Sequence, residues 1–304
     1  MTELPYGEVA RQLGFGHMRS GRTARNAVAF DDSTTLKMFS GRRDLRFRPD
    51  GQDPYRCELD GLAFWRDCLV ETPAVLDRGR CHGISWILMS RLDGSPPKGS
   101  FAALMGGTGA EARHRKLAMT AAELHRHIPS SRNVVLAGRG LPPVSARIEA
   151  FENASSLLAA DALVRLPELE ELIAAIESAY ETGDVTNLHG DYGFANVLMP
   201  GTSDCYSVVD FENSRIGFPE EDFVNVGFNG FGSVAFSSFL RQYAAAAGFA
   251  PRIALLRALM LERAFKVLMS DRERPGSVSR GYVQAAERVV HGLRRVRLSL
   301  ADIG

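Results

Sequence analysis

The chain has 304 residues, of which 45% are hydrophobic and 24% charged, so we expect a folded protein with a sizeable core rather than a disordered chain. Lys+Arg and Asp+Glu number 36 each, which gives a formal net charge of zero, and we expect no nucleic-acid partner. The length suits two lobes of about 100–200 residues each.

Charge is unevenly distributed along the chain. Residues 1–139 carry 21 basic and 15 acidic side chains, and residues 140–304 carry 15 basic and 21 acidic ones. This asymmetry would suit an anion bound by the first half and a polar or cationic molecule bound by the second. Scattered surface charge explains it equally well. Lysine is rare among the 36 basic residues, and the chain contains only four: Lys37, Lys98, Lys116 and Lys266.

The cysteines and the apolar runs indicate a reduced, soluble environment. The four cysteines are scattered, with no CxxC pair and no zinc-like spacing: Cys57, Cys68, Cys81 and Cys205. We therefore expect free thiols in a cytoplasmic protein. The N-terminus has no basic-then-apolar signal pattern, and no run approaches the roughly 20 apolar residues of a membrane span, so we expect no membrane partner.

The first 90 residues favour strands. "NAVAF" (26–30) and "TTLKMF" (34–39) flank the turn signal "DDS", and "ISWILMSRL" (84–92) is another buried strand. Between them, residues 56–68 show apolar residues at helical spacing. The segment "DGSPPKGS" that follows the last strand indicates a linker.

From about residue 100 the pattern becomes mostly helical. Apolar stripes at i, i+3, i+4 and i+7 spacing predict helices over 114–128, 166–180, 256–269 and 282–298. We therefore predict an α+β fold with two lobes: a small β-rich lobe over residues 1–92 and a larger, mostly helical lobe over residues 93–304.

The strongest chemical signal is "HGDYGFANVLM" (189–199) followed by "YSVVDFENSRIGFPEEDF" (206–223). The turn signal "PGTSD" between them predicts a hairpin that brings Asn196 and Asp210 together, with Asp191 close by. Buried carboxylate and amide oxygens require compensation. Such oxygens suit a hard divalent cation, usually Mg²⁺ held together with phosphate oxygens.

The ordered set H-G-D-x4-N, then hydrophobic-hydrophobic-D-F-E, then G-x-P-x-x-D resembles the aminoglycoside phosphotransferase family of kinase-like small-molecule kinases. The resemblance implies a protein-kinase-like fold that uses ATP and Mg²⁺. It implies that Asp191 is the catalytic base and that Asn196 and Asp210 are the Mg²⁺ ligands. His189 would brace the catalytic loop, and Asp222 would be a structural acceptor behind it.

Upstream residues fit the same resemblance. A kinase uses a strand lysine to neutralise the α/β-phosphates and an acid on the next helix to hold it. Lys37 and Glu58 take these places, although the 20 residues between them are long for the connection and Asp60 could compete. "WILMSRLDG" resembles the family's hinge, where backbone groups near Ser90 and Leu92 would contact the adenine.

Two further segments resemble the family less closely. "GFGHMRSGRTARN" (14–26) lacks a strict G-x-G-x-x-G, so the phosphate-covering loop is expected near Gly16–Arg25, with an ordinary turn as the alternative. "LAMTAAELHRH" resembles a helix of the family in which His125 would be a packed or capping histidine.

The expected function is ATP- and Mg²⁺-dependent phosphoryl transfer to a hydroxyl of a small molecule, by a monomer or homodimer. Protein kinases are disfavoured because only 11 residues separate Asp210 from Asp222, too few for an activation loop. The family suggests an antibiotic acceptor, either an aminoglycoside or a nucleoside or glycosylated compound. A metabolic kinase for choline, homoserine, a sugar or a nucleoside is the first alternative, and a kinase-like nucleotide-binding regulatory protein without turnover is the second.

The acceptor pocket is the part that the sequence predicts least. A polycationic aminoglycoside needs carboxylates, and four are candidates: Glu149, Glu152, Glu220 and Glu221. The sequence pI of about 7.1 argues against a strongly acidic cleft. "VNVGFNGFGSVAF" (224–236) offers a polar and aromatic mixture suited to a nucleoside or glycosylated antibiotic, or to helix packing alone: Asn225, Phe228, Asn229 and Phe231.

Overall fold

The computed structural model describes residues 6–22, 27–39, 53–96, 109–129, 136, 140–160, 169–199, 205–228, 234–276 and 278–292. The chain forms two compact units that alternate along the sequence. Unit 1 comprises Met1–Pro96, His127–Leu136 and Asn196–Ser214, and unit 2 comprises Pro97–Arg126, Ala137–Ala195 and Arg215–Gly304. The expected lobe boundary at residue 92 stays a prediction.

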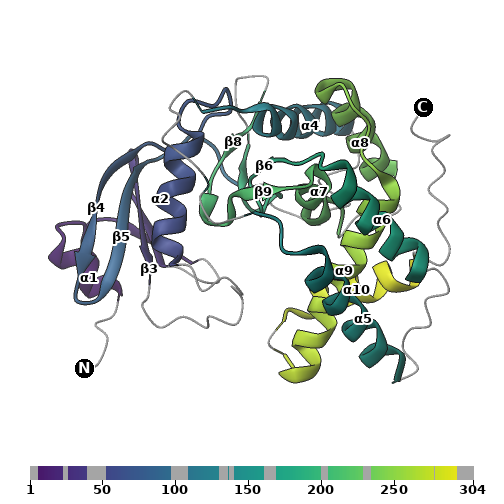
Figure 1. Ribbon diagram of the computed structural model, residues 1–304. Helices are drawn as coiled ribbons and strands as arrows, with labels where there is room; N and C mark the ends of the chain where they lie inside the picture. Colours follow the sequence, from purple (N-terminus) through teal and green to yellow (C-terminus); the bar gives the residue numbers. More distant parts are fainter. Residues whose placement is uncertain are drawn as a thin grey trace. The chain divides into compact units, whose positions relative to one another are not determined.

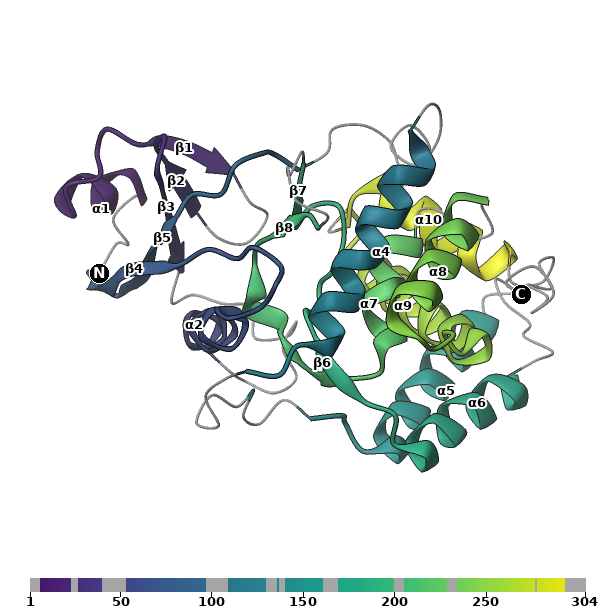
Figure 2. The ribbon, with the colours of Figure 1, turned by 90° about the horizontal axis from the view of Figure 1, so that it is seen from above.

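Unit 1 is built on an antiparallel sheet with strand order β1-β2-β3-β5-β4; Figure 1 labels β3, β5 and β4, and Figure 2 labels all five strands. The strands are β1 (Arg19–Arg22), β2 (Ala27–Phe30), β3 (Thr34–Phe39), β4 (Val75–Cys81) and β5 (Ile84–Ser90), preceded by α1 (Tyr6–Gln12). The "DDS" turn joins β2 to β3, because Asp31 Oδ1 accepts the N–H groups of Ser33 and Thr34. At the β4–β5 turn, His82 and Gly83 both have positive φ, the conformation that two-residue hairpins favour.

Helix α2 (Pro54–Trp65) follows the sheet strand that carries Lys37. It begins at an Asp53 cap, whose side chain accepts the N–H of Tyr55, and Pro54 is at the first helical position. The helix packs against the 3₁₀ turn η2 (Phe211–Asn213) of the same unit. A Cβ added at Gly61 would lie 2.5 Å from the Phe211 carbonyl oxygen, so a glycine is needed for this close approach.

The predicted hairpin is confirmed by the pairing of β7 (Val197–Leu198) with β8 (Ser207–Val208). Its turn residues lie outside the described part of the chain. The Asn196 carbonyl accepts the Val209 N–H at 3.0 Å, which extends the pairing by one residue. This register places Asn196 opposite Val209, immediately beside Asp210.

Unit 2 is helical around a short ribbon of β6 (Thr186–Leu188) and β9 (Arg215–Gly217). Its described helices are α4 (Ala110–Arg126), α5 (Val144–Ala160), α6 (Leu169–Thr182), α7 (Pro219–Gly227), α8 (Val234–Ala247), α9 (Ile253–Glu273) and α10 (Arg280–Gly292). Helix α9 is buried on several faces, because α5, α6, α7 and α10 all pack against it (Figure 2). Each predicted helical stretch overlaps one of these helices. Among the described residues, no helix has the length and apolarity to cross a membrane.

Candidate functional site

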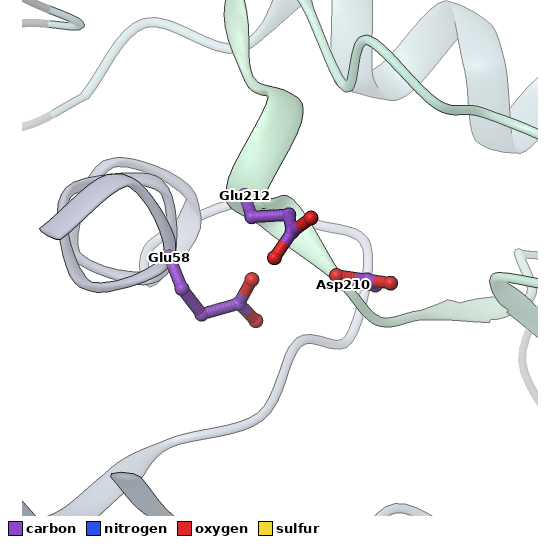
Figure 3. Close-up of side chains that lie close together, drawn as sticks. All are labelled: Glu58, Asp210 and Glu212. Atoms are coloured by element: carbon purple, nitrogen blue, oxygen red, sulfur yellow. The ribbon is translucent and has the colours of Figure 1, made fainter. Parts of the chain in front are cut away.

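Three carboxylates of unit 1 surround one buried ammonium group. Lys37 Nζ lies 2.9 Å from Glu58 Oε2, 2.6 Å from Asp210 Oδ1 and 3.7 Å from Glu212 Oε2. Figure 3 shows the three acidic side chains converging, Glu58 from α2 and the other two from the segment that follows β8. Glu58 therefore reaches Lys37 despite the long connection between them.

Local backbone geometry places these groups. Asp210 adopts a left-handed conformation, with φ of 70° and ψ of 65°, which is uncommon for a residue other than glycine and often marks a functional position. Its side chain does not cap η2, and it contacts Lys37 instead. Glu58 reaches the same ammonium because α2 approaches η2 closely at Gly61.

The Lys37 cluster, defined as Lys37, Glu58, Asp210 and Glu212, carries more negative than positive charge. Burial raises the pKa of Glu58 to about 7, and the negative neighbours add to this effect although Lys37 opposes it. Burial also disfavours the charged form of Lys37, but Asp210, Glu58 and Glu212 outweigh that penalty, so the pKa of Lys37 lies above its ordinary value.

The donor chemistry of this cluster fits a hard divalent cation. Oxygens of Glu58, Asp210 and Glu212 all lie within 4.8 Å of one another, and carboxylate oxygens are the ligands that Mg²⁺ prefers. Asn196 is buried, and its carbonyl pairs with the N–H of Val209, the residue before Asp210. Glu212 was not among the residues expected from the sequence, although it is the final residue of the D-F-E motif that signalled Asp210.

In unit 2, Asp222 holds the backbone of the loop that leads to Asp191. The fully buried Asp222 carboxylate accepts the N–H of His189 at 3.0 Å and of Gly190 at 2.8 Å. His125 Nε2 also donates to it at 3.2 Å. Burial alone would raise the pKa of Asp222, but the hydrogen bond from His125, together with the nearby Arg215, holds the pKa below its ordinary value.

Asp191 is held on both its backbone and its side chain. Its N–H donates to His189 Nδ1 at 3.2 Å, and its Oδ1 accepts from Asn225 Nδ2 at 2.9 Å. Arg215 donates to the carbonyl of the preceding residue, Gly190, at 3.2 Å. Asn225 was expected to contact an acceptor molecule or to pack between helices, and its contact with Asp191 was not anticipated.

Two of the four candidate acceptor-binding carboxylates form ion pairs inside unit 2. Glu220 is buried and accepts from the backbone N–H, Nε and Nη2 of Arg252 at 2.8, 3.1 and 3.0 Å. Glu221 accepts from Arg147 at 3.1 Å and from Arg215 at 2.7 Å. Glu149 and Glu152 are exposed on α5.

The expected adenine-binding segment is described in full, whereas the expected phosphate-binding segment is described only in part. The Ser90 N–H donates to Ala74, and its hydroxyl accepts the Ala74 N–H, both at 2.8 Å. These contacts do not involve a nucleotide, so the role of Ser90 and Leu92 in contacting the adenine stays a prediction. Gly16 precedes β1, and the residues that connect β1 to β2 lie outside the described part of the chain, so the phosphate loop also stays a prediction.

The family comparison agrees with the motif. The model of the phosphotransferase enzyme family (APH) matches residues 27–259, so the chain belongs to this family. No curated protein sequence matches the chain.

Solved structures of aminoglycoside phosphotransferases share the fold at low sequence identity. The GDP complex of wild-type aminoglycoside 2'-phosphotransferase-IIIa is 17% identical with a TM-score of 0.70, covering 96% of this chain and 100% of that one. The gentamicin complex of APH(2")-IIa is 16% identical with a TM-score of 0.58, covering 100% and 99%. APH(3'')-Id from Streptomyces rimosus is 17% identical with a TM-score of 0.54, covering 83% and 93%. The expected α+β, kinase-like fold is thus confirmed.

Proposed function

We propose that this chain transfers the γ-phosphoryl group of ATP to a hydroxyl group of a small molecule in the presence of Mg²⁺. The observation that carries the proposal is the Lys37 cluster, in which one ammonium contacts three carboxylates within a member of the phosphotransferase family. An excess of buried carboxylates is suited to a site that receives a further cation together with phosphate groups.

The roles in unit 1 concern the nucleotide. Lys37 neutralises the α/β-phosphates and is oriented by Glu58 at 2.9 Å. Asp210 and Asn196 would hold Mg²⁺, which would supply positive charge to the phosphate oxygens. Backbone groups at Ser90 and Leu92 would contact the adenine.

The role in unit 2 concerns the acceptor. Asp191 orients the acceptor hydroxyl and takes its proton as the phosphoryl group is transferred. His189 and Asp222 keep the loop in place through the contacts at 3.2, 3.0 and 2.8 Å. Most of the rate gain would come from positioning and charge stabilisation, because phosphoryl transfer requires little covalent chemistry from the protein.

We favour an antibiotic as the acceptor, because the similar solved structures are aminoglycoside phosphotransferases. The ion pairs of Glu220 and Glu221 remove two carboxylates from the set that would bind a polycation. This favours a nucleoside or glycosylated antibiotic over a highly charged aminoglycoside. A metabolic kinase for choline, homoserine, a sugar or a nucleoside is the alternative within the same chemistry.

A screen of nucleotide consumption tests the proposal. Purified protein with Mg²⁺ and either ATP or GTP is offered aminoglycosides, nucleoside and peptide antibiotics, choline, homoserine and simple sugars, and products are identified by mass spectrometry. We expect at least one phosphorylated product. Mg²⁺-dependent nucleotide binding without any product would instead support the regulatory protein without turnover.

The role of Asp191 is tested by Asp191→Asn, which keeps the size of the side chain and removes the base. We expect kcat for the identified acceptor to fall about 10²- to 10⁴-fold, the range typical of general-base removal. Nucleotide affinity, measured by calorimetry, should be unchanged. Retained turnover would exclude the role proposed for Asp191.

A further inference from the structure

One face of helix α7 contacts three consecutive residues of the loop that carries Asp191. Asp222 accepts the N–H groups of His189 and Gly190 at 3.0 and 2.8 Å, and Asn225 donates to the Asp191 carboxylate at 2.9 Å. Asp222 and Asn225 are three residues apart on the helix, and residues at this spacing share a face. The same face therefore holds both the backbone of the loop and its carboxylate.

We infer that Asn225 is a positioning residue for Asp191, a role that rests on the function proposed above. Asparagine is a poor helix former, and its amide is costly to bury without a partner. Asn225 lies half-buried in α7, and its donor is used on Asp191 Oδ1. Helix packing alone would be served better by an apolar residue.

The helix that carries Asn225 is anchored by contacts outside the loop. Helix α7 begins with Pro219 at its first position and carries Glu220, Glu221 and Asp222 in its first turn, where acidic groups interact favourably with the helix dipole. The helix packs against α9. The position of the Asn225 amide is thus fixed by packing that is separate from the loop.

A neutral amide suits this task chemically. A donor fixed on Oδ1 sets the plane of the carboxylate and hence the direction of Oδ2, toward which the acceptor hydroxyl would be oriented. A lysine or arginine in this place would stabilise the carboxylate more strongly and make it a weaker base. The amide orients Asp191 and takes up no proton itself.

The kinetic test compares Asn225→Leu, which removes the donor at similar volume, with the same substitution at the exposed Asn153 of α5. Asn225→Leu should lower kcat roughly 10- to 100-fold, as expected for a misplaced catalytic group, and leave KM for ATP unchanged. Asn153→Leu should leave both constants unchanged. Thermal unfolding of each variant shows whether a loss of kcat reflects a loss of folded protein.

Asn225→Asp provides a readout that a purely structural role would not give. At about pH 8 the introduced carboxylate repels Asp191 and cannot donate, so kcat should fall further than in Asn225→Leu. Toward about pH 6 the two carboxyl groups share a proton, which restores a donor, and the ratio of variant to wild-type kcat should rise.

A second measurement needs no acceptor molecule. The side-chain NH₂ resonance of Asn225, assigned by its loss in Asn225→Leu, should shift with pH in the wild-type chain, and Asp191→Asn should abolish that pH dependence. The inference would be overturned if the pH dependence of the NH₂ chemical shift were the same in Asp191→Asn as in the wild-type chain, or if Asn225→Leu kept wild-type kcat. Absence of transfer by the wild-type chain would instead overturn the proposed function.

Discussion

Each unit of the molecule contains a largely buried cluster of charges, and the two clusters differ in the ratio of positive to negative groups. In the Lys37 cluster of unit 1, one ammonium contacts three carboxylates. In unit 2, two guanidinium groups and two carboxylates form a network that we call the Arg147 network: Arg147, Arg215, Glu221 and Glu262. The first cluster is short of positive charge, whereas the second has one arginine for each carboxylate, and Lys266 also pairs with Glu262 at its edge.

The pKa shifts follow this difference. In the Arg147 network, burial would raise the pKa of Glu221 and of Glu262, but cationic partners hold both pKa values below the ordinary range: Arg215 and Arg147 for Glu221, and Arg147 with Lys266 for Glu262. In the Lys37 cluster, burial and like charges raise the pKa of Glu58 to about 7. A balanced network stabilises its charges internally. An unbalanced one is stabilised fully only by a further cation, which is the property expected of a functional site.

Among the substitutions that test the difference between the two clusters, Asp210→Asn should have the largest effect on activity. It removes a proposed Mg²⁺ ligand and one excess negative charge, so activity should fall without a loss of stability. We expect kcat to fall about 10³-fold, because a catalytic metal contributes several kcal/mol and about 1.4 kcal/mol corresponds to a factor of ten. The unfolding midpoint should rise or stay constant.

Initial rates across a Mg²⁺ series and thermal unfolding measure these two quantities. Asp77→Asn, at an exposed position of β4, makes the same chemical change outside the cluster and should alter neither. If the Asp210 variant kept wild-type turnover, the charge imbalance of the Lys37 cluster would have no role in catalysis.

Arg147→Met should show the opposite pattern. It leaves Glu221 and Glu262 with one cationic partner fewer, and breaking a buried ion pair on one side typically costs about 3–5 kcal/mol of stability. Urea unfolding measures the loss, with Arg288→Met at an exposed position of α10 as the control. The kcat of the folded variant should change much less than in Asp210→Asn. A stability equal to that of the control would contradict the structural role of the network.

Gly61→Ala should have a smaller effect, confined to unit 1. The added Cβ would lie 2.5 Å from the Phe211 carbonyl oxygen, so α2 has to shift and the 2.9 Å contact of Glu58 with Lys37 should lengthen. We expect kcat/KM for ATP to fall about tenfold, the kinetic equivalent of the lower end of typical overpacking costs. Gly281→Ala in α10, where a Cβ meets nothing within 4 Å, is the matched control. Equal kinetics in both variants would show that the close approach at Gly61 does not position Glu58.

The sequence predicted the elements and the motif because both depend on local patterns. Apolar periodicity identifies strands and helices one at a time, and the pairing of β7 with β8 follows from a turn signal between two apolar runs. The pairing of Lys37 with Glu58 was predicted from the family resemblance, because spacing alone left Asp60 as another possible partner of Lys37.

Other contacts could not be predicted, because they depend on how distant segments pack. Glu220 and Glu221 were expected to bind a cationic acceptor, and their arginine partners lie up to 74 positions away in the chain. Asn225 reaches Asp191 only because α7 is placed beside the loop by its packing against α9 and β6. The identity of a residue says little about such partners until the helix it belongs to has been placed.

The pH dependence of stability should be the smallest of these effects. It tests directly whether the Lys37 cluster and the Arg147 network differ in charge balance. The pKa of Glu221 is lowered by folding, so its contribution is present above the unfolded value of about 4.5 and is lost as the pH falls through the folded value. The pKa of Glu58 is raised from 4.5 to about 7, so its contribution is complete below about 4.5 and is lost as the pH rises through about 7. The two clusters should thus respond to pH with opposite signs.

Urea unfolding of Glu58→Gln, Glu221→Gln and the wild-type chain between about pH 2.5 and about pH 8 separates these contributions. Relative to wild type, Glu58→Gln should gain stability as the pH rises from about 4.5 to about 7, because only the wild-type chain has to ionise a buried acid there. Glu221→Gln should lose stability relative to wild type as the pH rises through the acidic range, with no further change at neutral pH. Slopes of the same sign would mean that Lys37 neutralises its carboxylates as completely as the arginines neutralise theirs, and the argument for a missing cation in unit 1 would fail.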